Sequence, residues 1–196
     1  QSGASLQLEA ANALANSGSI SAGTALTAQA ETNGNSGTNS AGGGMLSLAA
    51  QGLLTNSGGI GASNGSLSAR AASIANTGTI ASKADLTLNS ASSLSNVGGK
   101  ISNTAGLASI EAVGVLDNTG GTVLNQSGNM ILSAQDVTNN EGVIQAGGNL
   151  TAALGSYSSN AHSFFTAEQA LAVTVSGNLD NEGTLGGSTD VLVTAD

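Results

Sequence analysis

The sequence predicts an all-β fold, a parallel β-helix (solenoid) with about nine coils of 20–22 residues. Three observations predict it. An Asn-x-Gly motif returns at that period, a short apolar segment of alternating pattern precedes most of the motifs, and the composition is almost free of aromatic residues. A unit that recurs at a fixed period of this size is typical of stacked, solenoid architectures.

The repeated motif is an apolar residue, a variable residue, Asn, and a Gly two places later. The stretch "IANTGTI" at 74–80 has near copies at 14–20, 54–60 and 179–185. A degenerate copy lies around Asn33 or Asn35, and Asn160 stands midway between the last two motifs. With these two included, the repeat continues along the chain without a break. The clear motif asparagines are Asn16, Asn56, Asn76, Asn96, Asn118, Asn139 and Asn181.

Both constant residues of the motif have an architectural interpretation. The Gly is expected to adopt a backbone angle that side chains disfavour, and so to turn a corner. The Asn is expected to bond nearby backbone, or the Asn one coil away, in a ladder. A row of ligand-binding amides is the alternative. The turn glycines are Gly18, Gly58, Gly78, Gly98, Gly120 and Gly183.

Alternating apolar segments supply the strands. They include "LQL" at 6–8, "LTL" at 86–88, "LAVTV" at 171–175 and "VLV" at 191–193. This period of two fits a strand with one buried face, and no segment has the length or period of a helix. A leucine-rich repeat is disfavoured, because its Asn follows the strand by three residues, whereas the recurrent Asn here lies further on.

Composition restricts both the core and the partners. Hydrophobic residues make up 39% of the chain, aromatic residues 2% and charged residues 8%, which favours a narrow core of Ala, Leu, Ile and Val. No Cys is present, which excludes disulfides. A net charge of -9 argues against nucleic acid, and no apolar run is long enough for membrane insertion.

Several stretches resemble the haemagglutinin repeats of filamentous-haemagglutinin-like exoproteins. They are "LDNTGGTV" at 116–123, "VTNNEGVIQAGGNLTA" at 137–152 and "NLDNEGTL" at 178–185. The resemblance covers the whole chain, 1–196, as a single segment of a longer exoprotein. It implies a right-handed β-helical rod, exported unfolded through an outer-membrane two-partner transporter to the outer surface of a Gram-negative bacterium. It also implies that the parent protein is an adhesin or a contact-dependent growth-inhibition toxin, with this segment in its stalk.

Candidate catalytic, metal and cofactor sites are absent from the sequence, so an enzyme is not expected. The chain has one His, His162, and no Cys to partner it. Asp117 and Asp180 share a repeat position but lie three coils apart, about 14 Å at ordinary strand spacing. That separation exceeds the range of two carboxylates acting on one glycosidic bond.

One stretch departs from the repeat, "YSSNAHSFF" at 157–165, which holds every aromatic residue. Counting four residues from Asn160 puts Phe164 in the core, and alternation then turns Phe165 outward. Tyr157 is expected to point outward as well. The predicted contact patch is Tyr157, His162 and Phe165, and a locally repacked coil is the alternative reading.

The sequence therefore predicts a secreted structural stalk that displays a distal adhesive or toxic domain. The second hypothesis is an adhesin module that contacts a host or bacterial cell-surface receptor, or a glycan, through the coil around 157–165.

Overall fold

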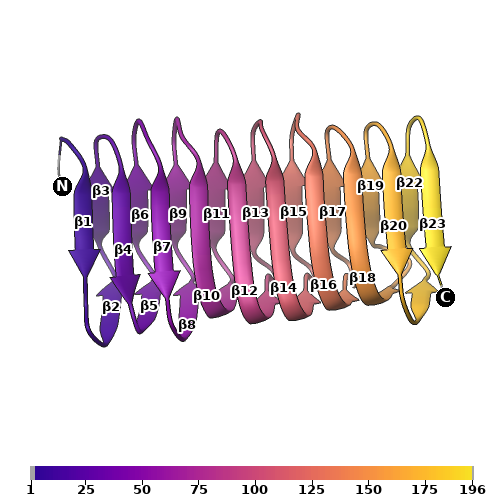
Figure 1. The fold of residues 1–196 in the computed structure, drawn as a ribbon, viewed down its shortest axis with the longest axis horizontal. Coiled ribbons are helices and arrows are strands. Elements are labelled where there is room, and N and C mark those ends of the chain that lie inside the picture. Colours follow the sequence, from indigo (N-terminus) through magenta and orange to yellow (C-terminus); the bar gives the residue numbers. More distant parts are fainter. Residues whose placement is uncertain (1–2, 196) are drawn as a thin grey trace.

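The computed structural model describes residues 3–195 and confirms the predicted architecture. The chain winds as a right-handed parallel β-solenoid of about nine coils, numbered here from the amino-terminal end (Figure 1). Residues 3–195 contain strands and turns only, so no helix in this range could span a membrane.

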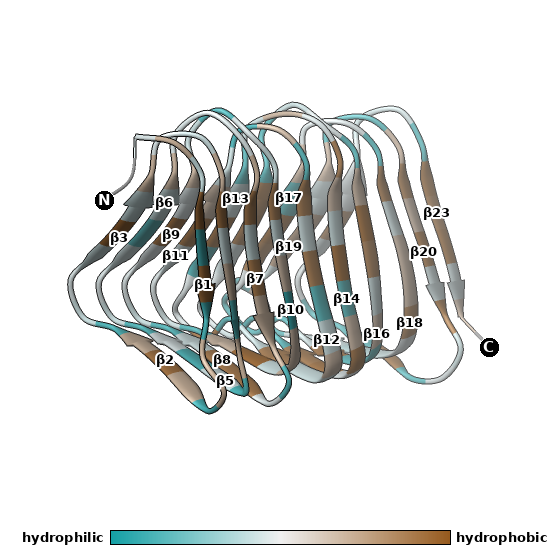
Figure 2. Cartoon of the chain, turned by 60° about the vertical axis from the view of Figure 1, so that its left-hand side comes forward, coloured by the Kyte–Doolittle hydropathy of each residue, from teal (hydrophilic) through white to brown (hydrophobic). Residues whose placement is uncertain are grey.

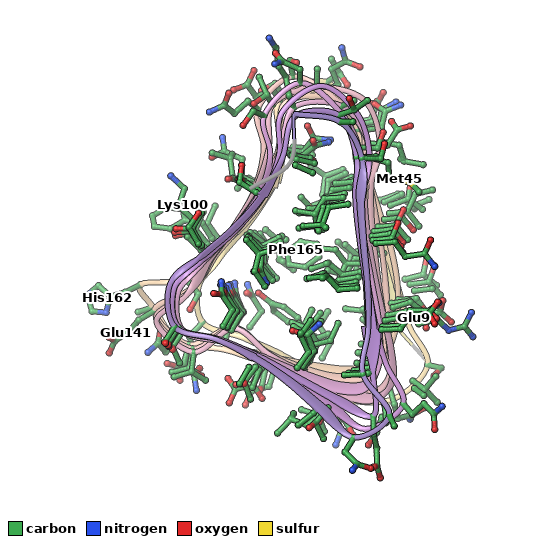
Figure 3. All side chains as sticks on the ribbon, turned by 90° about the vertical axis from the view of Figure 1, so that its left-hand side faces the viewer. Glu9, Met45, Lys100, Glu141, His162 and Phe165 are labelled. Carbon is green, nitrogen blue, oxygen red and sulfur yellow. The ribbon has the colours of Figure 1, made fainter. Side chains whose placement is uncertain are left out.

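In cross-section each coil is a triangle with three strand-bearing faces (Figure 3). The long face and the base face belong to one sheet, because the strands of coils four to eight bend from one into the other. The third face is a separate sheet of nine strands. The turns between the base face and the third face are called the asparagine corner below.

The long face begins each coil. Its strands are β1 (Leu6–Glu9), β4 (Leu26–Ala30), β7 (Leu46–Ala50), β20 (Leu171–Val175) and β23 (Val191–Ala195). Between β7 and β20 it is formed by the first parts of five longer strands that continue into the base face: β10 (Leu67–Asn76), β12 (Leu86–Ser95), β14 (Ala108–Asp117), β16 (Met130–Thr138) and β18 (Leu150–Ser159).

Separate strands form the base face only near the two ends. They are β2 (Ala13–Asn16), β5 (Thr32–Asn35), β8 (Leu53–Asn56) and β21 (Leu179–Asn181). The third face runs through all nine coils as β3 (Ser19–Ala22), β6 (Thr38–Ala41), β9 (Gly59–Ala62), β11 (Thr79–Ser82), β13 (Lys100–Asn103), β15 (Thr122–Asn125), β17 (Val143–Ala146), β19 (Phe164–Ala167) and β22 (Thr184–Gly187).

Parallel register turns the core into columns of like residues. Leu26, Leu46 and Leu67 pair in succession on the long face, and each is at most 1% exposed. Apolar and polar segments alternate along these strands (Figure 2). Because each column holds one side chain per coil at about 4.8 Å, medium aliphatic residues fill the interior and aromatic bulk is not needed.

The core columns are uncovered at both ends of the described chain. Leu14 and Ile20 in coil one, and Leu179 and Leu185 in coil nine, are only partly buried. Interior members of the same columns, such as Ile80, are fully buried. Both end coils therefore present the cross-section of an ordinary core layer.

Candidate functional site at the asparagine corner

A continuous ladder of side-chain amides fills the asparagine corner. Each Nδ2–H donates to the Oδ1 of the next coil at 2.7–2.9 Å, always toward the carboxy-terminal end. All members are at most 7% exposed. The ladder runs through Asn16, Asn35, Asn56, Asn76, Asn96, Asn118 and Asn139.

From Asn35 to Asn118, each amide also donates to a main-chain carbonyl on its own turn and to one on the following coil. Asn96 Nδ2 donates to the Gly99 and Thr122 carbonyls at 3.2 Å, as well as to Asn118 Oδ1 at 2.7 Å. One side chain thus closes the turn and ties two coils together. The geometry is that of a structural brace, since these bonds occupy the polar atoms inside a buried column.

Of the two candidates in coil two, Asn35 joins the ladder and Asn33 does not. Asn33 is 2% exposed and pairs in register with Leu14 and Leu54, so an amide stands in an aliphatic column. Its Nδ2 has no hydrogen-bond partner within residues 3–195.

Asn33→Leu is therefore expected to stabilise the rod by about 1–2 kcal/mol, because it removes a buried unsatisfied donor and continues the Leu column. Chemical denaturation measures the change. Asn35→Leu is the matched control, since the same substitution two residues on breaks the ladder and should be destabilising. A loss of stability with Asn33→Leu would contradict this account.

The turn glycines act differently from the sequence prediction. A positive φ is found at Gly98 and Gly120 but not at Gly18, Gly58, Gly78 or Gly183, so the backbone-angle explanation is wrong for these four. At Gly78 the cause is close stacking, because a Cβ there would overlap the Gly58 carbonyl oxygen of the preceding coil. Gly18, in the first coil, would meet nothing within 4 Å.

Gly78→Val is expected to destabilise the rod by about 1–3 kcal/mol, the usual cost of forcing extra atoms into packed structure. Gly18→Val is the matched control and should stay within about 0.5 kcal/mol. Paired thermal melts compare the two. Equal melting temperatures for the two variants would show that inter-coil contact does not fix the glycine.

Coil eight departs from the ladder. Register places Ser159, not Asn160, between Asn139 and Asn181, which corrects the sequence assignment of Asn160. Asn139 Nδ2 donates to the Tyr157 hydroxyl at 3.4 Å, and Ser159 Oγ donates to Asn181 Oδ1 at 2.8 Å. In coil eight the Tyr157 hydroxyl therefore accepts the ladder bond from coil seven, and the Ser159 hydroxyl donates the ladder bond to coil nine.

Asn160 holds the corner turn of coil eight instead. Its Oδ1 accepts from Glu141 N at 2.9 Å, Ser163 Oγ at 2.8 Å and His162 N at 3.3 Å. Ser163 occupies the position of Gly142 in the preceding turn, because Phe164 N donates to the Gly142 carbonyl and Thr184 N donates to the Ser163 carbonyl in the same way. The turn is therefore one residue longer than its neighbour, and His162 lies on it, exposed (Figure 3).

The aromatic residues occupy positions opposite to those predicted. Phe165 is 0% exposed and Tyr157 is 2% exposed, and their rings meet edge to face with centroids 5.4 Å apart. Phe164 is 47% exposed. The prediction that Tyr157 and Phe165 point outward is wrong, because it counted from Asn160 and missed the extra turn residue. Of the predicted patch, only His162 is exposed.

Burial shifts the pKa of the Tyr157 hydroxyl. Desolvation raises the pKa of its hydroxyl above the ordinary value of 10.0, although hydrogen bonds from Asn139 and Ser159 act in the opposite direction.

The chain has one Tyr and no Trp, so ultraviolet absorbance titration reports Tyr157 alone. We expect a midpoint above that of an unfolded control in denaturant. The unfolded chain loses this proton first, so stability falls as pH rises above about 10. A midpoint at or below that of the control would contradict the buried position.

Glu141 is the one non-glycine residue within 3–195 with a positive φ, at 55°. It stands where Gly98 and Gly120 stand in the two coils before it, with similar angles. Its side chain projects from the corner beside His162 of the next coil (Figure 3).

A cluster of metal-ligating side chains is not found in the described residues. No group of three or more His, Cys, Asp or Glu side chains in 3–195 could hold a metal ion. The main hollow is an open trough where the long face meets the base face, floored by alanines such as Ala30, Ala50 and Ala71. The irregular part of the asparagine corner lies in coils seven and eight, at Glu141 and around Asn160.

Comparison with known proteins agrees with this architecture. The haemagglutinin repeat family matches residues 1–58, 62–120, 97–183 and 146–196, which together span nearly the entire chain. Comparisons with curated proteins and with solved structures gave no match. Because this family model matches nearly the whole sequence, the chain belongs to the haemagglutinin repeat family.

Proposed function

We propose that this chain is a section of the rigid stalk of a filamentous-haemagglutinin-like exoprotein, secreted to the outer surface of a Gram-negative bacterium. The stalk holds a distal adhesive or toxic domain away from the cell. Nine coils contribute about 45 Å of reach at ordinary strand spacing. Haemagglutinin-repeat solenoids are typically structural or adhesive, which favours this role over catalysis.

The observation that carries the proposal is the uniform stack with open core columns at both ends. Half-buried Leu14 and Ile20 at one end, and Leu179 and Leu185 at the other, fit a further coil of the same repeat. Because each coil contacts only its neighbours, such a rod can be lengthened without altering its cross-section.

Export through a dedicated outer-membrane transporter is part of the proposal. The chain has no Cys, so no disulfide can form while it is unfolded in transit. Folding outside needs only stacking of successive coils, which are local in sequence.

The experiment replaces this segment in the parent protein with an unrelated β-solenoid of equal length, and compares that protein with a deletion of the segment. We expect the deletion to shorten the projecting rod by about 45 Å in electron micrographs and to weaken adhesion or killing. The length-matched replacement should restore both. Failure of the replacement to restore function, with normal surface display, would overturn a purely mechanical role.

A further inference from the structure

The net charge of the chain lies entirely in its second half. Residues 1–100 carry three acidic residues, Glu9, Glu31 and Asp85, and all three basic residues, so their charges cancel. Residues 101–196 carry the other nine acidic residues and no Lys or Arg, and 0 - 9 gives the total of -9. One half of the rod is neutral and the other half is strongly acidic.

Four of these acidic residues border the asparagine corner in coils six to nine. Glu141 and Glu182 lie on the turns of coils seven and nine, on either side of the His162 turn, and both are exposed. Asp117 and Asp180 directly precede ladder-register residues on the base side of the same corner. Glu141 and Glu182 lie two coils apart, about 10 Å at ordinary strand spacing, so they border coil eight from both sides.

The exposed ring of Phe164 lies at the start of the third face, directly after this corner. It pairs in register with Val143 of coil seven, which is half-buried. Earlier coils place Ser19, Thr38, Gly59 and Thr79 at the Phe164 position. Val143 and Phe164 thus place apolar side chains in two successive coils, at a position that holds Lys100 and Thr122 in the two coils before them and Thr184 in the coil after them.

The corner turn beside the ring is held in place. Asn160 binds it from inside through three hydrogen bonds, one of them to the backbone of Glu141 on the neighbouring turn. Glu141 and His162 project outward from the triangle at this corner (Figure 3). A ligand that reaches this edge meets one exposed ring, flanked by turns that carry exposed carboxylates.

We propose that Phe164, Val143, Glu141 and Glu182 form a docking surface for a basic segment of a partner protein. Lys or Arg side chains of the partner bind the two carboxylates, one of them lies against the Phe164 ring, and an adjacent apolar residue covers Val143. Carboxylates supply charge-assisted hydrogen bonds, and an aromatic face attracts a cation. The acidic half steers basic partners toward the rod and repels anionic glycans. This role goes beyond the stalk function and does not depend on it.

The test measures binding of the intact chain to three probes at low and moderate salt: a labelled peptide of Lys and Leu, a Lys-only peptide of equal charge, and neutral oligosaccharides. We expect the Lys and Leu peptide to bind most tightly. Phe164→Ala should weaken the complexes of both Lys-containing peptides about tenfold, because in each a Lys side chain lies against the ring. Glu141→Gln with Glu182→Gln should weaken binding of both peptides and reduce the salt dependence.

Matched controls come from the neutral half. Met45→Ala removes another exposed apolar side chain, 51% exposed, and Glu31→Gln removes another carboxylate. Neither should change binding, and circular dichroism should show all variants folded. Equal losses for Met45→Ala and Phe164→Ala would overturn the proposal. Binding of a neutral oligosaccharide through Phe164, with no peptide binding there, would also overturn it in favour of a glycan site.

Discussion

Asn96→Ala is expected to lower the free energy of unfolding by about 3–5 kcal/mol. The substitution removes three bonds donated by Nδ2 and one accepted from Asn76, all in a column that is fully buried at this coil. Each buried partner left unsatisfied costs about 1–3 kcal/mol, and neighbouring amides in a chain polarise one another. Equilibrium urea denaturation, with unfolding curves fitted for slope as well as midpoint, measures the loss.

The control is Asn64→Ala. Asn64 donates to the Gly42 carbonyl at 2.7 Å but is exposed, so water replaces its partners and the expected loss is about 1 kcal/mol or less. Similar losses for the two variants would mean that the ladder contributes no more than a surface hydrogen bond.

Phe165→Ala is expected to cost about 3–5 kcal/mol, and Phe164→Ala to stay within about 0.5 kcal/mol. The two residues are adjacent and chemically identical, but Phe165 is fully buried against Tyr157 and Phe164 is 47% exposed. Paired denaturation curves measure the difference directly.

Phe165→Leu separates loss of volume from loss of the ring. Ile144 and Leu185 pair with position 165 on either side, so Leu restores an aliphatic column and should recover much of the stability lost in Phe165→Ala. A greater loss at Phe164 than at Phe165 would show that the strand register is shifted by one residue.

The fold could be predicted because its determinants are periodic. In a parallel stack, one residue per coil occupies each column, so a column appears in the sequence as a repeat. Asn76, Asn96 and Asn118 were recognisable as such a column without coordinates, and the structure joins them in one ladder. Coil two was ambiguous between Asn33 and Asn35. The Gly37 that follows Asn35 by two places was the signal that distinguishes them.

The positions of the aromatic residues in coil eight were mispredicted because of an inserted turn residue. The insertion shifts Asn160 relative to the ladder position, whereas the flanking strands keep their register. Phe165 lies six residues after its ladder position at Ser159, whereas Ile144 lies five after Asn139 and Ile80 lies four after Asn76. Counting from the preceding strand, 21 residues from Ala146 to Ala167, gives the correct register. An inserted residue is absorbed in the loop, because the paired strands keep their hydrogen bonds.

The roles of the glycines could not be separated from sequence. The backbone at Gly98 has a positive φ, and a carbonyl oxygen lies close to Gly78. Both conditions disfavour a side chain, so both positions are occupied by Gly and look alike in the sequence. Only the three-dimensional structure, which places successive turns against one another, shows whether a Gly is needed for its positive φ or for its close contact with the preceding coil.

The amide ladder also gives the rod a direction during assembly. Every Nδ2–H points toward the carboxy-terminal end, so a finished coil presents an oriented donor to the next one. From coil two to coil seven, a coil in the correct register completes that bond with its own Asn, and up to coil six it presents an equivalent donor in turn. A coil that slips by one residue brings the wrong side chain to the corner and leaves the donor unpaired. Each ladder bond therefore links the register of one coil to that of the next, in a single direction along the rod.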